Sequence, residues 1–303
     1  MPISRILTTV AALGAAALVL TGCSGGQGST GSKGTIVVGS ANFTESKIVA
    51  SLYAEALRAK GYTVTEKFNI GSREAYVPAV RDGSIDVIPD YTGNLLQYLD
   101  PSTTATSSEQ INGALSEALK SKGLKMYSPA KAEDKDSVVV TSETARKWNL
   151  SSIEDLAKHN SELTFGANAE FQERAAGLPG LKAKYGLQPS KFVAIADGGG
   201  PKTVSSLLDG TVTAADIYTT TPAIVANNLV VLKDPQNNFA AGNVLPVINA
   251  GKSTDDIQKV LDAVSAQLST EALTQLNDQV SGDAKKEPAA VSKAWLKDKG
   301  LLN

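Results

Sequence analysis

The chain of 303 residues contains an internal repeat at a spacing of 127 positions, the distance from Tyr91 to Tyr218. The pairs that match at this spacing are Gly71 and Gly198, Val77 and Val204, Asp82 and Asp209, Gly83 and Gly210, Tyr91 and Tyr218, and Thr92 and Thr219. These six identities fall within 22 residues without a gap. Such a repeat indicates that the chain folds into two similar units.

Each copy of the repeat has the same predicted structure: a short helix that ends in Asp-Gly, a buried apolar strand, and a Tyr-Thr turn that opens the next helix. In open α/β sheets, ligands bind beyond the carboxyl ends of the strands. Tyr91 and Tyr218 therefore stand where a ligand would be held, in a cleft between two lobes. The alternative is that each tyrosine only fills a strand-to-helix corner, and the repetition favours the ligand.

Composition narrows the class of protein. The chain is 42% apolar, which is enough for two α/β lobes with separate cores. The formal net charge is −2 and no basic cluster stands out, so we expect no nucleic-acid partner.

The first residues resemble a bacterial lipoprotein signal peptide. Arg5 precedes an apolar run from Ile6 to Leu20, and Leu20-Thr21-Gly22-Cys23 matches a lipobox, after which cleavage would leave Cys23 as the lipidated first residue. The alternative is a transmembrane anchor, but a run of about 15 residues falls short of the roughly 20 that span a bilayer. Cys23 is also the only cysteine, which excludes an intramolecular disulfide and a cysteine-based metal cluster.

The rest of the chain predicts a two-lobed α/β fold. A Gly/Ser-rich linker fills residues 23–34, and apolar runs at 137–141 and 244–249 are interpreted as crossings between the lobes. Helices are predicted, among others, at 108–122, 142–148, 152–158, 254–267, 269–279 and 288–299. The predicted division is residues 1–22 signal peptide, 23–34 linker, 35–137 with 240–303 lobe one, and 138–239 lobe two.

The strand at 35–39 leads into a helix through a turn that contains Asn42, Phe43 and Thr44. Asn42 and Glu45 have the spacing of a capping box, in which the two side chains would bond to the first backbone N–H groups of the helix. Such a turn presents backbone N–H groups to the cleft. Asn42 is therefore a candidate ligand-binding residue.

Four segments together resemble the substrate-binding proteins of ABC importers for quaternary ammonium osmoprotectants, the ProX-type family for glycine betaine, choline and carnitine. The segments are 38–45 (VGSANFTE), 90–93 (DYTG), 170–180 (EFQERAAGLPG) with Tyr185-Gly186, and 218–220 (YTT). The resemblance covers nearly all of residues 35–303. It implies a type II periplasmic-binding-protein fold, no enzymatic activity, and delivery of a small solute to a membrane permease by a monomer anchored outside the cytoplasm through a lipid on Cys23.

In that family an aromatic cage surrounds the trimethylammonium group, while an arginine holds the ligand carboxylate. The resemblance implies that Tyr91 and Tyr218 occupy two cage positions and that Arg174 is the carboxylate-binding arginine. Asn94 falls at a cage-adjacent position that is often threonine. From the residues alone, a surface ion pair is the favoured explanation of Arg174, and it is the resemblance that makes ligand binding the expectation.

The other two cage positions fall on Asp136 and Gly242 and are not aromatic. Asp136 is a candidate counter-charge for a cation, although a solvated charged loop explains it as well. A glycine in place of a ring is expected to enlarge the pocket. Glycine betaine or choline is the ligand that the resemblance implies, and a bulkier betaine or an uncharged polyol or polyphenol is the alternative.

The competing class is a lipid-anchored hydrolase. The sequence has neither a Gly-x-Ser-x-Gly elbow nor a His-Glu-x-x-His helix, and its one histidine, His159, follows a lysine at a predicted helix end. Carboxylate-only chemistry of the glycosidase type stays open. Because the enzyme motifs are missing and the chain resembles binding proteins, we expect no catalytic residues, no metal and no cofactor.

Overall fold

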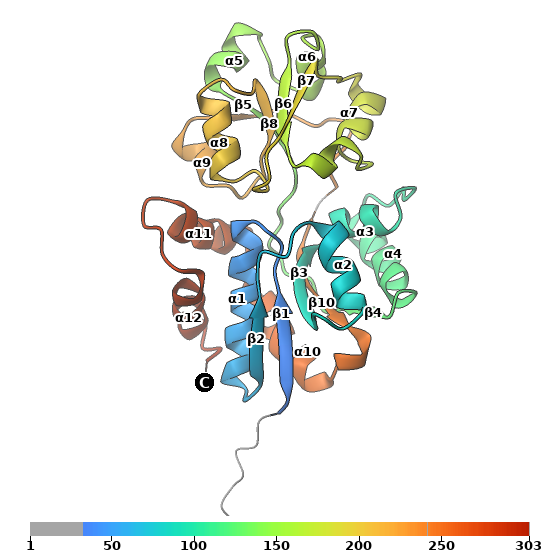
Figure 1. Cartoon of the computed structure of the whole chain (residues 1–303), viewed down its shortest axis with the longest axis vertical. Coiled ribbons are helices and arrows are strands. Elements are labelled where there is room, and N and C mark those ends of the chain that lie inside the picture. The colour runs from blue at the N-terminus through green and yellow to red at the C-terminus, as the bar shows by residue number, and fades with distance from the viewer. Residues whose placement is uncertain (1–32, 241, 303) are drawn as a thin grey trace, which may run out of the picture. The chain divides into compact units, whose positions relative to one another are not determined.

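A computed structural model describes residues 33–240 and 242–302, all of which belong to one compact unit, Ser32–Asn303. This unit contains two five-stranded sheets with helices on their faces (Figure 1). The predicted α/β class with two lobes is confirmed. Cys23 and the predicted signal peptide lie outside the described residues.

The first sheet has the strand order β2-β1-β3-β10-β4. Its strands are β1 (Thr35–Gly39), β2 (Thr63–Lys67), β3 (Val87–Tyr91), β4 (Leu124–Met126) and β10 (Val244–Asn249). The three strands β2, β1 and β3 are parallel, whereas β10 is antiparallel to both β3 and β4. Because β10 enters this sheet from the far end of the chain, the first lobe is built from two separate segments.

Helices cover both faces of the first sheet, as the alternation of apolar residues along its strands requires. In β10, Val244 and Ile248 pack in one core, whereas Leu245 and Val247 pack in the other. The first core is closed by α1 (Thr44–Ala59), α10 (Asp255–Gln267), α11 (Thr270–Ser281) and α12 (Pro288–Asp298). The second core is closed by α2 (Arg73–Arg81), α3 (Thr92–Leu99) and α4 (Ser108–Lys120).

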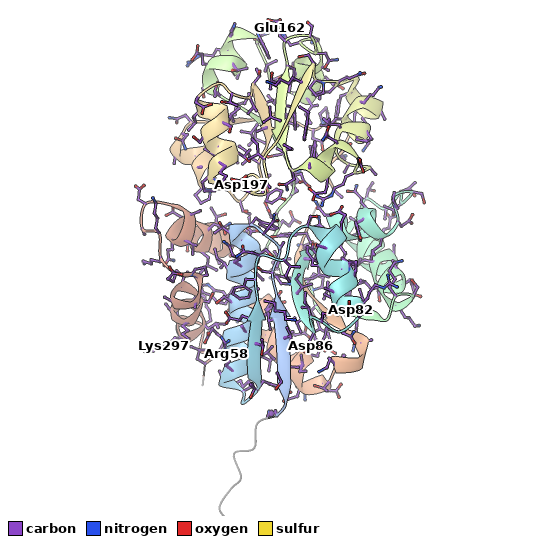
Figure 2. The ribbon with its side chains drawn as sticks, in the orientation of Figure 1. Arg58, Asp82, Asp86, Glu162, Asp197 and Lys297 are labelled. Carbon is purple, nitrogen blue, oxygen red and sulfur yellow. The ribbon has the colours of Figure 1, made fainter. Side chains whose placement is uncertain are left out.

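The second sheet has the strand order β7-β6-β8-β5-β9. Its strands are β5 (Val138–Val140), β6 (Thr164–Ala167), β7 (Lys191–Ala194), β8 (Ala214–Asp216) and β9 (Val230–Val231). One face packs on α5 (Ser142–Lys147), α6 (Ile153–Ala157) and α7 (Leu178–Tyr185), and the other on α8 (Pro201–Leu208) and α9 (Ala223–Ala226). Side chains fill the space between strands and helices in both lobes (Figure 2).

The internal repeat corresponds to the same structural unit in both lobes. Helices α2 and α8 end at Arg81 and Leu208, and the following strands begin at Val87 and Ala214, so both pairs keep the spacing of 127. The Asp-Gly turns between them place Gly83 and Gly210 at φ of 79° and 78°, in the left-handed region that favours glycine. Both β3 and β8 are the middle strand of their sheet, between one parallel and one antiparallel neighbour.

Some elements were not expected from the sequence. The strands β4, β7 and the helix α7 were missed, because the first two are only three and four residues long and α7 begins in a Gly/Pro-rich stretch. In α7, Pro179 occupies the first turn, where a missing N–H group costs nothing, and Gly186 ends the helix at φ 68°. Two 3-10 helices, η1 (Ala169–Gln172) and η2 (Ala250–Lys252), complete the fold.

Candidate functional site

The candidate site lies where the two sheets present the carboxyl ends of their parallel strands. Asn42 and Tyr91 follow or end strands β1 and β3, whereas Tyr218 follows β8 of the second sheet. Asp136 lies just before β5, which runs antiparallel to β8 and therefore begins at the same edge. The central cavity at this place is lined by Ala41, Asn42, Phe43, Ser72, Arg73, Tyr76, Tyr91, Asn94, Asp134, Lys135, Asp136, Asn168, Arg174 and Tyr218.

All six ligand-binding residues predicted from the sequence thus line one cavity, namely Asn42, Tyr91, Asn94, Asp136, Arg174 and Tyr218. Contact with a ligand remains a prediction for each of them. The central cavity has a volume of about 30 Å³, which corresponds to roughly one water molecule. A larger solute therefore needs the surrounding side chains or lobes to move apart.

Three aromatic rings meet at the central cavity. Phe43 lies between the two predicted cage residues, with ring centroids 6.2 Å from Tyr91 and 5.2 Å from Tyr218. The Phe43 and Tyr218 rings are edge-to-face, at an interplanar angle of 72°. Phe43 was not predicted as a site residue. Its place directly after the first strand, beside Asn42, could have indicated that it lies at the ligand-binding edge of the sheet.

Negative charge lies beside the rings. Asp136 accepts a short hydrogen bond from the Asn94 side chain amide. Its neighbour Asp216 is buried, and Oδ1 of Asp216 has no hydrogen-bond partner among the described residues. Burial, followed by the neighbouring charge of Asp136, raises the pKa of Asp216 well above its usual range. A cation in the cavity would relieve this repulsion.

Both arginines at the cavity are already paired with carboxylates. Arg174, next to the second sheet, donates to both oxygens of Glu74 on α2, at 3.2 and 3.0 Å. Burial raises the pKa of Glu74, but the hydrogen bonds from Arg174, from Ser72 and from the backbone, together with the charge of Arg174, outweigh burial and lower the pKa to about 2. Arg73 donates twice to buried Asp90, at 3.0 and 2.6 Å. The ion pair considered for Arg174 therefore exists, and it joins the two lobes.

The predicted capping box at the start of α1 is wrong. The helix begins at Thr44 with Phe43 at the N-cap position, and no side chain caps it. Asn42 lines the cavity and makes no side-chain hydrogen bond within the described residues. Glu45 points elsewhere, because its buried carboxyl group has other partners.

Glu45 is the centre of a buried polar network that the sequence analysis missed. Its Oε1 accepts from the Tyr91 hydroxyl at 2.6 Å, and its Oε2 accepts from the Thr220 hydroxyl and the Asn277 amide. Nearby, Oδ1 of Asp134 accepts from the backbone N–H of Thr220 at 3.1 Å. The network therefore connects α1 and α11 of the first lobe to the segment after β8 of the second.

The two carboxyl groups of this network share a buried environment. Burial raises the pKa of Glu45 against the opposing hydrogen bonds from Thr220, Tyr91 and Asn277. Burial and the charge of Glu45 raise the pKa of Asp134 well above its usual range. The pair therefore holds a proton to higher pH than two exposed carboxyl groups would.

The expectation that Gly242 enlarges the pocket is also wrong. A Cβ atom at this position would lie 2.4 Å from the backbone oxygen of Asp134 and 3.2 Å from the Cβ of Tyr91. The space beside Gly242 is therefore filled by the backbone of Asp134 and by the side chain of Tyr91. In this backbone arrangement no side chain fits there.

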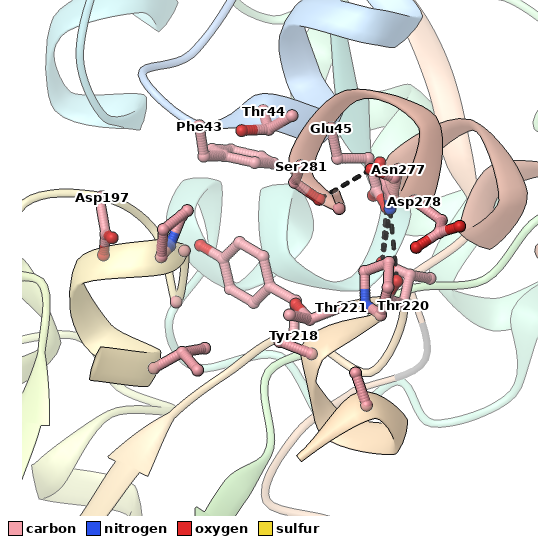
Figure 3. A pocket seen from close by; sticks show the side chains of 18 of the residues that line it. Phe43, Thr44, Glu45, Asp197, Tyr218, Thr220, Thr221, Asn277, Asp278 and Ser281 are labelled. Carbon is pink, nitrogen blue, oxygen red and sulfur yellow. Dashed lines mark hydrogen bonds between the residues drawn. The ribbon is translucent and has the colours of Figure 1, made fainter. Parts of the chain in front are cut away.

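A second and larger cavity, the outer compartment, is also lined by Phe43 and Tyr218 (Figure 3). It has a volume of about 420 Å³. Its lining residues come from the start of α1, from residues 197–208 and 218–227 of the second lobe, and from residues 277–285 at the end of α11. The outer compartment shares only Phe43 and Tyr218 with the central cavity.

Among residues 33–240 and 242–302, no helix combines the length and the apolar composition that a membrane span requires. Within the same ranges, no group of three or more histidine, cysteine, aspartate or glutamate side chains is arranged to hold a metal ion.

Comparison with known proteins identifies the class of this site. The family model described as the substrate binding domain of an ABC-type glycine betaine transport system matches residues 34–298. The glycine betaine-binding protein YehZ of Escherichia coli is 29% identical over 280 residues, which cover 88% of this chain and 90% of that protein. The carnitine transport binding protein OpuCC of Listeria monocytogenes is 25% identical over 271 residues, covering 88% and 87%.

A solved structure has the same fold. The crystal structure of a glycine betaine/carnitine/choline ABC transporter protein superimposes with a TM-score of 0.68, covering 88% of this chain and all of the other, at 22% identity. This likeness confirms the type II periplasmic-binding-protein architecture with its two lobes.

Proposed function

Because the chain belongs to the family of substrate-binding domains of ABC-type glycine betaine transport systems, we propose that it captures a quaternary ammonium compound between its lobes. The family consists of solute-binding proteins outside the cytoplasm that deliver a small molecule to a permease, and not of enzymes. The competing hydrolase class is therefore excluded. The identity of the solute is the part that is proposed here.

The observation that carries this proposal is the meeting of three rings and one carboxylate at the central cavity. Phe43, Tyr91 and Tyr218 lie within 6.2 Å of a neighbouring ring centroid, and Asp136 lines the same cavity. A quaternary ammonium group has no N–H donor, so ring faces and a nearby negative charge are the interactions open to it, at about 0.5–2 kcal/mol for each ring face. Phe43 supplies one of the aromatic rings that are missing from the two cage positions occupied by Asp136 and Gly242.

Binding requires the rings to separate. The central cavity is too small for a trimethylammonium group, and the edge-to-face contact of Phe43 with Tyr218 closes one side of it, so the cation has to break this contact. Phe43 belongs to the first lobe and Tyr218 to the second. Ligand binding is therefore coupled to the relative movement of the lobes, which we propose to comprise residues 35–137 with 240–303, and 138–239.

A specific observation favours choline-like over betaine-like ligands. The relatives are named for glycine betaine and carnitine, both of which carry a carboxylate. Here Arg174 and Arg73 are paired with Glu74 and Asp90, so a ligand carboxylate has to compete with a carboxylate of the protein, or lie beside it, at the same guanidinium group. A ligand without a carboxylate avoids this cost.

Isothermal titration calorimetry on residues 24–303 tests the proposal, with choline, glycine betaine, carnitine and ergothioneine as ligands and proline and a polyphenol as controls. We expect binding of a quaternary ammonium compound, about tenfold weaker affinity in Tyr218→Ala, and near-normal affinity in Tyr218→Phe, which keeps the ring. Heat from the polyphenol but from none of the four quaternary compounds would assign the protein to the alternative ligand class of uncharged polyols or polyphenols, and heat from proline alone would reject both classes.

We further propose that Cys23 carries a lipid that anchors the protein to the membrane and that residues 23–34 form the tether. The support is the lipobox-like Leu20-Thr21-Gly22-Cys23 and the Gly/Ser-rich composition that follows it. Membrane fractionation of the wild type and of Cys23→Ala tests this, because only the wild type should sediment with membranes. We propose a monomer, for which light scattering should give the mass of one chain.

A further inference from the structure

The outer compartment is larger than the proposed cage and is not explained by it. At about 420 Å³ it has room for a group of several non-hydrogen atoms, whereas the central cavity has about 30 Å³. The Phe43 and Tyr218 rings form the common wall (Figure 3). When a ligand separates these rings, the central cavity therefore becomes connected to the outer compartment.

One side of the outer compartment is apolar. Pro201, Val204 and Leu208 of α8 line it, together with Pro222 and Ala223 at the start of α9. Leu208 is 48% exposed, so part of this apolar side is open to a ligand. This side is suited to the methylene groups of a short alkyl stem.

The opposite side carries hydrogen-bond acceptors. Asp278 and Asp283 lie at the exposed rim, and neither makes an ion pair within the described residues, whereas Lys285 is the one positive side chain of the lining. Asn277 also lines the compartment; it is 5% exposed, and its Oδ1 has no hydrogen-bond partner in the described part of the chain. The acidic side chains of the lining therefore outnumber its basic side chain.

From this lining we infer that the outer compartment binds a protonated alkylamine, with the stem on the apolar side and the N–H groups toward Asp278 and Asp283. Unlike the cage, which suits a cation without N–H groups, this compartment suits a cation that donates hydrogen bonds. Two sources offer this chemistry. The amine is either the distal end of a ligand whose quaternary head lies in the cage, an arrangement that rests on the proposed function, or a separate molecule.

Titration with a matched series of compounds separates these cases. The probes are pentyltrimethylammonium, (5-aminopentyl)trimethylammonium, (5-carboxypentyl)trimethylammonium, and pentylammonium without a quaternary head. For one spanning ligand we expect the aminopentyl compound to bind about three- to tenfold more tightly than the pentyl compound at low ionic strength, and the carboxypentyl compound to bind more weakly. For a separate molecule, pentylammonium should bind to protein already saturated with choline.

Two pairs of variants locate the amine. Asp278→Asn combined with Asp283→Asn should abolish the advantage of the aminopentyl compound, whereas Glu271→Gln, which removes a charge at the other end of α11, should leave it. Ala226→Trp should fill the compartment, whereas Val225→Trp is the control, because Val225 is 84% exposed on the same helix and does not line it. Neither pair alters a residue of the proposed cage.

The results decide the two proposals independently. Equal affinities of the pentyl and aminopentyl compounds, with no binding of pentylammonium, would overturn the inference while leaving the cage proposal in place. An advantage of the amine that survives the double aspartate variant would also overturn it. Binding of pentylammonium that depends on Asp278 and Asp283, with no binding of any quaternary compound, would support the outer site and reject the proposed function.

Discussion

Phe43 shows how much a single side chain decides at this site. The sequence places it in a turn beside Asn42, where it looks like any apolar residue that anchors a helix start. In the fold its ring contacts both Tyr91 and Tyr218 and separates the central cavity from the outer compartment. The residue therefore contributes to affinity and to the size of ligand that fits.

The first prediction concerns the ring face of Phe43. Phe43→Leu keeps an apolar side chain but removes the π system, and it should weaken choline binding by about 3- to 30-fold, the equivalent of one cation–π contact. Calorimetry measures the change, and circular dichroism controls for folding. An unchanged dissociation constant in Phe43→Leu would show that this ring does not contact the ligand.

The second prediction concerns the crowding at Gly242. Gly242→Ala places a methyl group 2.4 Å from the Asp134 backbone oxygen and should lower the free energy of unfolding by about 1–3 kcal/mol. Gly113→Ala is the matched control, because Gly113 lies within α4 with nothing within 4 Å of its Cβ position, and it should raise stability by about 0.5–1 kcal/mol. Urea denaturation measures both changes in the free energy of unfolding. No change in Gly242→Ala would mean that the backbone at Asp134 moves aside at no cost.

At the scale of elements, the network around Glu45 joins segments that are far apart in the chain. Glu45 lies in the first turn of α1, Asn277 in α11, Thr220 after β8 and Asp134 in the connection that precedes β5. Because Tyr91 also donates to Glu45, the network touches the proposed cage. Protonation of Glu45 or Asp134 therefore affects the hydrogen bonds that join the first lobe to Thr220 of the second.

The third prediction is the pH dependence of this network. The pKa values of Glu45, Asp134 and Asp216 are raised in the folded protein, so the folded state binds more protons than the unfolded state above about pH 4. Their contribution to stability is fully present below that pH and is lost as the pH rises through the raised pKa values. The free energy of unfolding should therefore fall between pH 5 and pH 8.

Asp134→Asn tests the assignment, because the amide keeps the acceptor for Thr219 and Thr220 and mimics the protonated acid. It should flatten the pH profile by up to about 1.4 kcal/mol per pH unit, the value for one proton. Asp298→Asn, an exposed change on α12, should leave the profile unaltered. Equal slopes in the wild type and Asp134→Asn would contradict the raised pKa of Asp134.

At the scale of the whole molecule, the ion pair of Arg174 with Glu74 connects the two lobes beside the central cavity. The pKa of Glu74 is about 2, so its charge persists throughout the neutral and mildly acidic range. The pair therefore remains formed at physiological pH and competes with any ligand carboxylate for the guanidinium group. Selectivity between ligands thus depends on a contact between lobes.

The fourth prediction follows from that competition. Glu74→Gln should release Arg174 and strengthen binding of glycine betaine about three- to tenfold relative to choline. The ratio of the two dissociation constants is the measurement, because it cancels effects on lobe closure that both ligands share. Glu173→Gln serves as the control at a carboxylate that makes no ion pair among the described residues. A ratio that stays constant in Glu74→Gln would show that Arg174 does not contact the carboxylate.

The sequence by itself determined the repeat, the α/β class, most element positions and three residues of the central cavity, Asn42, Tyr91 and Tyr218, whereas the family resemblance supplied Asn94, Asp136 and Arg174. These features depend on local patterns, since apolar periodicity, Asp-Gly turns and strand ends are set by residues close together in the chain. The repeat also related the two lobes, because identical local patterns at a spacing of 127 residues fold into the same unit.

Only the tertiary structure decided which side chains meet across the lobes. Glu45 changed from a predicted helix cap to a buried acceptor, Arg174 gained Glu74 as its partner, and Gly242 proved to be crowded instead of open. Each outcome depends on groups from separate elements, such as Glu74 with Arg174 and Glu45 with Thr220, whose distance is fixed by the order of the strands and the path of the chain between the lobes. Burial and pairing then set the charges of these groups, and no local sequence pattern specifies them.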